Sequence, residues 1–242
     1  MTDKWKKLRD EGLWANVEPE VELRSMTVPV TIEDDVYVQP VTELRFCPNY
    51  KWSKSGIESQ VTEAAIVSTG AQVKDQDSLV RKLINMGHHT PLEAIQFNFR
   101  ITGISKACGA QMSRHRVGQG HVSSSRRYQT QGIQFVYPLL ENIDDEDVAR
   151  RAYCVIQDSY KQAYSEYQGL RSLGVKKGDC RYLIPTASAS ERIWWVNARA
   201  LRDFLRLRLH PTAEAEIRRL ATMIHGIVSK ITPTLFEDID CD

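Results

Sequence analysis

The sequence has little of what marks a strongly charged, cross-linked or membrane-spanning protein. Its 242 residues hold 32 Lys and Arg against 31 Asp and Glu, and this near-neutral balance argues against a general nucleic-acid coat. Five scattered cysteines without a Cys-x-x-Cys pair argue against a disulfide framework and a zinc site. No apolar run approaches the roughly 20 residues that cross a bilayer, and the charged start lacks a signal-peptide core. We expect a cytoplasmic protein with no membrane, metal or nucleic acid as partner.

No low-complexity linker or internal repeat divides the chain, so we expect a single domain over residues 1–242. Residues 1–40 are predicted to form an N-terminal arm with an edge strand at 28–38, where apolar residues partly alternate. The alternation in residues 93–102 predicts a further strand that ends at Gly103. Its buried face is predicted to consist of Ile95, Phe97, Phe99 and Ile101.

Apolar residues that recur every three or four positions predict several helices. They cover residues 78–87, 105–116, 144–173, 189–209 and 212–231. Gly87 and Gly174 are predicted to cap the first and third of them, and Val148 and Val155 belong to the apolar stripe of the third. The fold class is therefore α+β, an antiparallel sheet packed with several long helices.

The most informative segment spans residues 111–128, which are rich in arginine, histidine, serine and glutamine and hold no carboxylate. Arg114 and Arg116 keep their charge, and their planar guanidinium groups suit phosphate oxygens. His115 between them is expected to be pushed towards its neutral form. The segment is predicted to run from a helix end into a glycine-rich loop, in which Gly118 and Gly120 allow the backbone to approach a ligand closely. The segment predicts a site for several phosphates, with a solvated basic loop as the alternative.

Three more segments contain candidate ligand-binding side chains. Residues 87–93, Gly-His-His-Thr-Pro-Leu-Glu, offer no further metal ligand at a useful spacing, and a turn that enters a strand is the alternative. Arg181 precedes an apolar tripeptide, and a surface salt bridge is its alternative. In residues 197–208, Arg202 and Arg206 are expected to form a charged helix face beside the core.

In this order, the segments resemble the motifs of the flavin-dependent thymidylate synthases, the ThyX family. The signature of that family is Arg-His-Arg, seven or eight residues, and then Ser-x-Arg-Tyr. Here Arg114-His115-Arg116 is followed, after eight residues, by Ser125-Arg126-Arg127-Tyr128. Residues 88–93 resemble the His-x-Ser/Thr-Pro-x-Glu segment, and 180–185 resemble Ala-Arg-x-x-Leu-Pro. Residues 197–208 resemble Asn-x-Arg-x-Leu-x-x-Phe-Leu-x-Leu-Arg, and Glu216-Ile217-Arg218 follow as in the family.

The resemblance implies an FAD-dependent methyltransferase that converts dUMP to dTMP, with methylenetetrahydrofolate as the carbon donor and NADPH as the reductant. It implies a homotetramer whose active sites are shared between subunits. The residues implied for FAD are His88, Thr90, Arg114, His115, Arg116, Asn197, Arg199 and Asp203. Those implied for dUMP are Gln111, Ser124, Ser125, Arg127, Arg181 and Arg208. Ser125 is expected near the reacting face, with Ser124 as the alternative, and Arg208 is expected to stabilise charge on the pyrimidine.

The chain departs from the family pattern at several positions near the implied site. Residues 119–123 stand where Ser-x-Asn-Glu is usual, and the other departures are Ala94, Gly178, Asp203 and Glu214. They motivate a second hypothesis, methylation or hydroxymethylation of another pyrimidine deoxynucleotide such as dCMP. A third is a non-catalytic RNA- or DNA-binding protein, although only Tyr128 interleaves with the basic residues. No cysteine lies in a comparable basic motif, so a cysteine nucleophile is not expected.

Overall fold

The computed structural model describes residues 19–26, 55–69, 73–125 and 132–239, and these fall into two compact units. Of the described residues, the first unit contains 19–20, 101–114, 122–125 and 132–192, and the second contains 21–26, 55–69, 73–100, 115–121 and 193–239. The single domain over residues 1–242 stays a prediction. No helix in the described ranges is both long and apolar enough to span a membrane.

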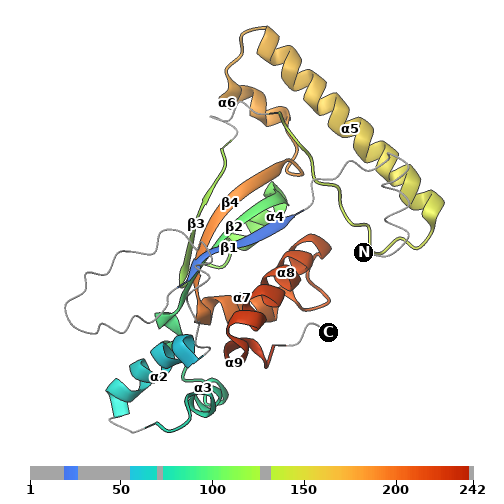
Figure 1. The fold of residues 1–242 in the computed structure, drawn as a ribbon. Helices are drawn as coiled ribbons and strands as arrows, with labels where there is room; N and C mark the ends of the chain where they lie inside the picture. Colours follow the sequence, from blue (N-terminus) through green and yellow to red (C-terminus); the bar gives the residue numbers. More distant parts are fainter. Residues whose placement is uncertain (1–18, 27–54, 70–72, 126–131, 240–242) are drawn as a thin grey trace, which may run out of the picture. The chain divides into compact units, whose positions relative to one another are not determined.

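Four strands form one antiparallel sheet in the order β1-β2-β4-β3, which confirms the α+β class (Figure 1). The strands are β1 (Glu20–Met26), β2 (Gln96–Ser105), β3 (Gln119–Ser123) and β4 (Ala189–Asn197). β1 lies at an edge of the sheet. The segment 28–38, for which the sequence predicts an edge strand, lies outside the described residues, as does most of the predicted arm.

β2 confirms the alternation predicted from the sequence. The side chains of the predicted face, Ile95, Phe97, Phe99 and Ile101, are completely buried. The strand was predicted to end at Gly103 but continues to Ser105. Gly103 adopts a φ of 71°, a conformation that glycine permits within the strand. Beyond it Ile104 and Ser105 are both buried, so the alternation shifts by one residue.

The helix predicted over residues 189–209 is wrong in its first half, because β4 occupies residues 189–197. Ser190, Arg192, Trp194 and Val196 are buried, and the residues between them are more exposed. Aromatic and β-branched side chains in this pattern favour a strand. The second half is confirmed as α7 (Ala198–Arg208), which begins directly after the strand.

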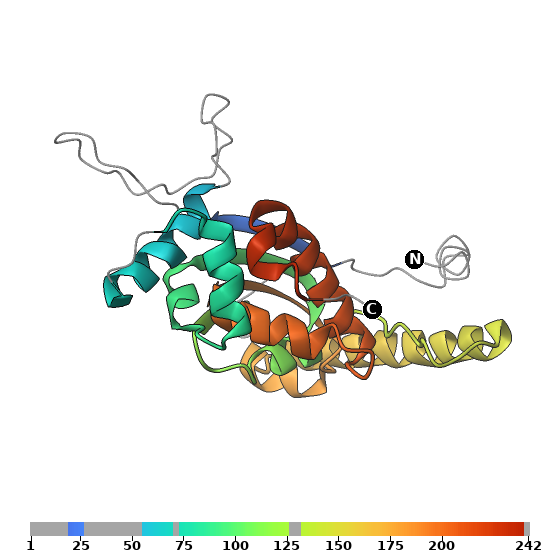
Figure 2. The ribbon, with the colours of Figure 1, turned by 90° about the horizontal axis from the view of Figure 1, so that it is seen from below.

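The second unit contains most of the helices. They are α2 (Ser55–Thr69), α3 (Gln76–Asn85), η1 (Thr90–Ala94), α7, α8 (Ala215–Ile231) and α9 (Pro233–Phe236). α7 and α8 pack side by side, as Figures 1 and 2 both show. α8 confirms the predicted helix 212–231, and Pro233 follows its end. α2 has no counterpart among the predicted helices, although its buried residues Ile57, Val61 and Ala65 are spaced four apart.

α3 ends in a Schellman motif that fixes the backbone ahead of His88. Gly87 adopts a φ of 73°, and its N–H donates to the carbonyl of Ile84 at 3.1 Å. The N–H of His88 donates to the carbonyl of Leu83 at 2.9 Å. This pair of hydrogen bonds is the arrangement that a glycine just past a helix end permits. The predicted cap at Gly87 is therefore confirmed.

The first unit contains α4 (Lys106–Met112), α5 (Glu146–Ser172), α6 (Lys177–Cys180) and η2 (Arg181–Leu183). α4 ends at Met112, four residues before the predicted end at Arg116. Just beyond the helix, the N–H of Arg114 donates to the carbonyl of Gln111 and closes a turn. α5 matches the predicted helix 144–173 closely. Asp145 caps its start with two backbone hydrogen bonds, and Gly174 follows its end with a φ of 83°.

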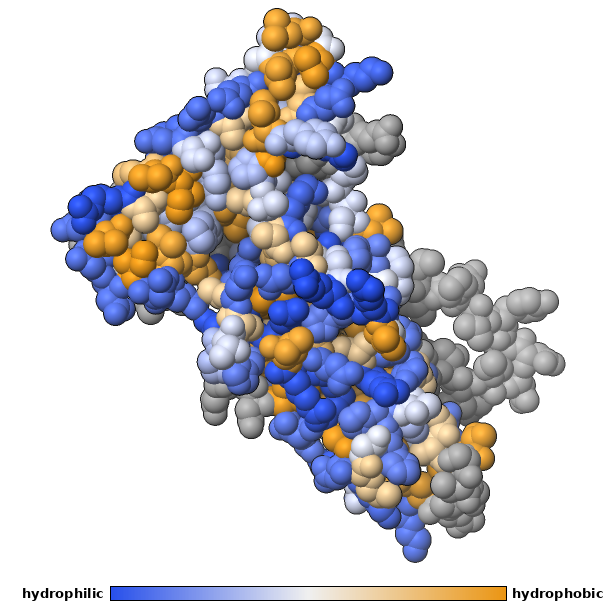
Figure 3. Space-filling view, turned by 180° about the vertical axis from the view of Figure 1, so that it is seen from behind, coloured by the Kyte–Doolittle hydropathy of each residue, from blue (hydrophilic) through white to orange (hydrophobic). Residues whose placement is uncertain are grey.

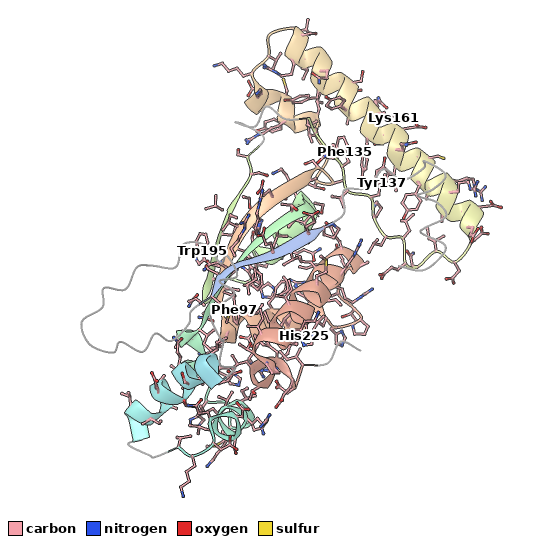
Figure 4. The ribbon with its side chains drawn as sticks, viewed as in Figure 1. Phe97, Phe135, Tyr137, Lys161, Trp195 and His225 are labelled. Atoms are coloured by element: carbon pink, nitrogen blue, oxygen red, sulfur yellow. The ribbon has the colours of Figure 1, made fainter. Side chains whose placement is uncertain are left out.

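The buried face of α5 differs from the predicted stripe because tyrosines make it. Tyr153 is buried and its hydroxyl donates to the carbonyl of Pro138 at 2.7 Å, while Val155 is 70% exposed. Phe135 and Tyr137 lie beside α5 (Figure 4), and the ring of Phe135 stacks on Tyr160 at 4.6 Å. Aromatic rings with a polar tip satisfy backbone carbonyls as they pack. Figure 3 shows hydrophobic side chains left at the surface along α5, at its upper left.

Candidate functional site

A cavity of about 410 Å³ in the first unit brings three predicted nucleotide-binding residues together. Ser124, Ser125 and Arg181 line it. Ser124 is fixed beside β4, because its N–H donates to the carbonyl of Glu191 at 2.8 Å and its Oγ accepts from Glu191 N–H at 3.1 Å. Ser125 is exposed beside it. The volume lies in the range of small-molecule sites.

Four further residues line the same cavity, and none of them was predicted from the sequence to bind the nucleotide. They are Lys106, Tyr182, Ile184 and Ser188. Lys106 begins α4, and its N–H donates to the carbonyl of Ser188 at 3.1 Å. No periodicity or motif in the sequence marks Lys106 or Ser188. Only the pairing of distant segments of the chain brings these two residues close to Ser124.

The other predicted nucleotide-binding residue that the structure describes in this unit, Gln111, is not among the residues that line the cavity. Gln111 is half-buried near the end of α4, and Arg127 lies outside the described residues. Arg114, predicted to bind FAD, is exposed two residues after the end of α4. An exposed guanidinium beyond a helix end is accessible to a ligand, which is what the prediction requires.

In the second unit, His115 and Arg208 form a direct pair. Arg208 Nε donates to His115 Nε2 at 3.1 Å, and the imidazole packs edge-on against Phe204 with ring centroids 5.1 Å apart. Burial lowers the pKa of His115, the charge of Arg208 lowers it further, and Asp203 opposes both. The imidazole is thus neutral at pH 7, as predicted, and it accepts from the arginine.

A second cavity of about 550 Å³ in this unit is bordered by His88 and Thr90. The rest of its lining is largely apolar and consists of Ala64, Ala65, Val73, Leu79, Leu83, Gly87, Pro91 and Ala94. Ala94, where the family pattern has a second histidine, leaves one wall without a polar group. An apolar cavity with a few polar groups at its border is typical of cofactor sites.

The predicted residues Arg199 and Asp203 lie on α7, and Asn197 lies directly before it at the end of β4. Asn197 caps the helix, since its Oδ1 accepts from Ala200 N–H at 2.8 Å. Arg199 Nη1 donates to Glu93 Oε1 at 2.6 Å, and both side chains are nearly half exposed. This ion pair ties α7 to η1, the segment that carries Thr90. Asp203 is exposed and Arg116 is exposed after His115.

The two glycines of the signature segment serve the protein's own packing. Gly118 has a φ of 68°, and an added Cβ would lie 2.5 Å from Asn197 Nδ2. Gly120 lies in β3, and an added Cβ would lie 2.5 Å from the ring of Trp195, which is labelled in Figure 4. The predicted glycine-rich loop is therefore wrong at residues 119–123, which form a strand. The close approach that these glycines permit is to protein side chains.

Arg202 and Arg206 have the structural role predicted for them, but Arg202 is buried and not on a solvated face. Its guanidinium donates to both carboxylate oxygens of Asp238, at 2.7 and 2.6 Å, and to the carbonyl of Leu235. Arg206 donates to the same carboxylate at 2.9 Å. The pair joins α7 to the segment after α9.

Among the described residues, no three His, Cys, Asp or Glu side chains lie close enough together to hold a metal ion. Cys108 and Cys180 are buried. Cys180 Sγ faces the carbonyl of Val175 at 3.5 Å.

Comparison with known proteins gives a family-level match over most of the chain. A sequence model of the family described as "Thymidylate synthase complementing protein" matches residues 49–234. The chain is 31% identical over 197 residues to a flavin-dependent thymidylate synthase of Thermosipho africanus, covering 75% of this chain and 86% of that protein. It is 30% identical over 175 residues to one of Clostridium tetani, covering 65% and 70%. It is 32% identical over 165 residues to one of Geobacter sulfurreducens, covering 68% and 69%.

Proposed function

The chain belongs to the flavin-dependent thymidylate synthase family, and from this premise we propose how its residues serve the family's reaction. The reaction is the FAD-dependent reductive methylation of dUMP at C5 to dTMP. Methylenetetrahydrofolate supplies the carbon and leaves as tetrahydrofolate, and NADPH is the reductant. The family match over residues 49–234 is the observation that carries this conclusion.

The cavity of the first unit fits the nucleotide. Arg181 and the hydroxyls of Ser124 and Ser125 offer donors that suit phosphate and sugar oxygens. Gln111 and Arg127 complete the proposed dUMP-binding set. Ser125, whose side chain is exposed, is proposed to lie near the reacting face of the pyrimidine, with Ser124 as the alternative.

The second unit fits FAD through its cavity and its basic side chains. His88 and Thr90 border an apolar cavity that suits an aromatic ring system. When bound, FAD carries electrons from NADPH to the carbon that becomes the methyl group. The other residues proposed to hold it are Arg114, His115, Arg116, Asn197, Arg199 and Asp203.

Arg208 is proposed to stabilise negative charge on the pyrimidine ring. Its hydrogen bond to the neutral imidazole of His115 orients the guanidinium without neutralising its charge. A charged group held in place before the reaction needs little reorganisation when charge develops. His115 would act here by positioning Arg208.

We further propose the homotetramer with shared active sites. The exposed apolar residues Val148 and Val155 of α5 and Leu173 just beyond it support this, since apolar surface suits a subunit interface. The cytoplasmic location also stays a prediction. The dCMP hypothesis gains no support from the relatives, and family membership argues against a non-catalytic nucleic-acid-binding protein.

Turnover of purified protein tests this function. We expect dTMP, detected by mass spectrometry, from dUMP, methylenetetrahydrofolate, NADPH and FAD, and none when FAD is omitted. Addition of dUMP should also perturb the flavin absorbance band. A parallel reaction with dCMP should yield no product. Protein that retains flavin yet leaves dUMP unchanged would contradict the proposal.

A further inference from the structure

The cavity around Arg181 has an unusual balance of charge. Its lining includes two cations, Lys106 and Arg181, and three hydroxyls from serines, but no carboxylate. Among the described residues Arg181 has no ion-pair partner, and its Cζ lies over the ring of Tyr182, 5.9 Å from the ring centroid. A lining with two cations and no carboxylate favours an anion with more than one charge.

Lys106 is held so that its ammonium group reaches this cavity. The backbone of Lys106 is tied to Ser188, and its Nζ donates to the carbonyl of Ser124 at 3.4 Å. That distance is near the upper limit for a hydrogen bond, and the acceptor is neutral. A phosphate oxygen would be a stronger acceptor for the same ammonium group.

Ser188 supplies a second and independent indication of a ligand. Its side chain is completely buried, and its Oγ has no hydrogen-bond partner in the described structure. The backbone holds it there, because its N–H donates to the carbonyl of Pro185 at 3.0 Å and its carbonyl accepts from Lys106. A buried hydroxyl without a partner is costly, so a bound group that accepts from it would remove that cost.

We propose that Lys106 and Ser188 bind the phosphate of the nucleotide together with Arg181. The inference rests on the proposed function, because it takes the cavity to be the dUMP site. Both residues lie within the range 49–234 that the family model matches, but neither belongs to the motif segments by which the sequence resembles the family. The dianion would receive a charge-assisted hydrogen bond from Lys106 and a neutral one from Ser188.

Three variants and one control test the proposal. Lys106→Gln removes the charge, Lys106→Arg keeps it, and Ser188→Ala removes the hydroxyl. Lys161→Gln is the matched control, since Lys161 lies on α5 in the same unit with a 67% exposed side chain (Figure 4). Holoenzyme is titrated with dUMP and, separately, with deoxyuridine, and kcat and KM are measured.

We expect Lys106→Gln to weaken the binding of dUMP about 10- to 100-fold, which is the range for the loss of one hydrogen bond to a charged group, and to leave kcat almost unchanged. Deoxyuridine, which has no phosphate, should bind equally to Lys106→Gln and wild type. Lys106→Arg should recover most of the affinity, and Lys161→Gln should match wild type. Ser188→Ala should weaken dUMP about 2- to 10-fold. Without nucleotide it should melt at or above the wild-type temperature, because it removes a buried unpaired hydroxyl.

Several outcomes would overturn the proposal. If wild type methylates dUMP and Lys106→Gln binds it as well as Lys161→Gln does, the inference fails and the proposed function stands. If Lys106→Gln weakens deoxyuridine as much as dUMP, the lysine does not act on the phosphate. If wild type neither binds nor methylates dUMP, the proposed function fails and the inference fails with it.

Discussion

Replacement of Gly118 by alanine tests whether the end of β4 and the start of α7 are as tightly packed as the structure has them. The new Cβ would lie 2.5 Å from Asn197 Nδ2 and 2.8 Å from both Cγ and Oδ1. The two backbones cannot separate easily, because Asn197 N–H donates to the carbonyl of Gly118 at 2.8 Å. The asparagine side chain must therefore move and give up its cap on Ala200.

The expected magnitude has two parts. A φ of 68° costs an alanine about 1–2 kcal/mol relative to glycine. Loss of the helix cap costs about 1 kcal/mol. The free energy of unfolding should fall by roughly 2–3 kcal/mol, which for a chain of this size lowers the melting temperature by about 4–12 °C.

Thermal unfolding followed by circular dichroism measures this, with Gly226→Ala as the control. Gly226 lies within α8 and a Cβ there would meet nothing within 4 Å, so alanine should stabilise by about 0.5–1 kcal/mol. The double variant Gly118→Ala with Asn197→Gly should melt above Gly118→Ala alone, since glycine caps almost as well as asparagine and removes the clash. A Gly118→Ala protein that melts within about 1 °C of wild type would refute the reasoning.

Three further predictions concern charged contacts of the second unit. The pKa of His115 is lowered in the folded protein, so its contribution to stability should be full above the unfolded-state pKa of about 6.5 and should be lost as the pH falls below that value. Arg208→Gln should raise the folded-state pKa of His115 and so reduce this loss of stability. An NMR titration that finds His115 at or above 6.5 in wild type would contradict this. Asp238→Asn should lower the free energy of unfolding in urea by about 3 kcal/mol, because it leaves the buried Arg202 without its carboxylate. Adding Arg202→Met should recover part of this loss, and an equal loss in the single and the double variant would argue against a buried ion pair. Glu93→Gln removes an exposed ion pair and should cost less than about 1 kcal/mol in thermal unfolding, and a much larger loss would mean the pair is not solvated.

Local signals in the sequence predicted much of the fold. The alternation around Phe97, the stripe of α8 and the glycine after α3 depend on neighbours within a few residues, and each was confirmed. The helix predicted over 189–197 failed because its spacing fits both helix and strand over so short a run. Pairing with distant segments of the sheet decides between them.

In the candidate site too, local motifs identified some of the residues, whereas others are brought together only by the fold. Motifs identified Ser124 and Arg181, and the structure places them on one cavity. Lys106 and Ser188 lie 82 residues apart in the sequence, and neither has a local pattern that points to a ligand. The role of Gly118 was also misread, because the side chain that requires its missing Cβ is Asn197, far along the chain.

The hydrogen bonds that follow α3 constrain the length of the chain more than the identity of its side chains. The N–H groups of Gly87, His88 and His89 each donate to a nearby carbonyl, and Leu92 N–H closes the next turn on His89. An inserted or deleted residue would rotate His88 and Thr90 away from the cavity that they border. Substitutions such as the alanine at 94 change its wall and leave this geometry intact. Variation among relatives is therefore expected to alter side chains in this segment while keeping its number of residues.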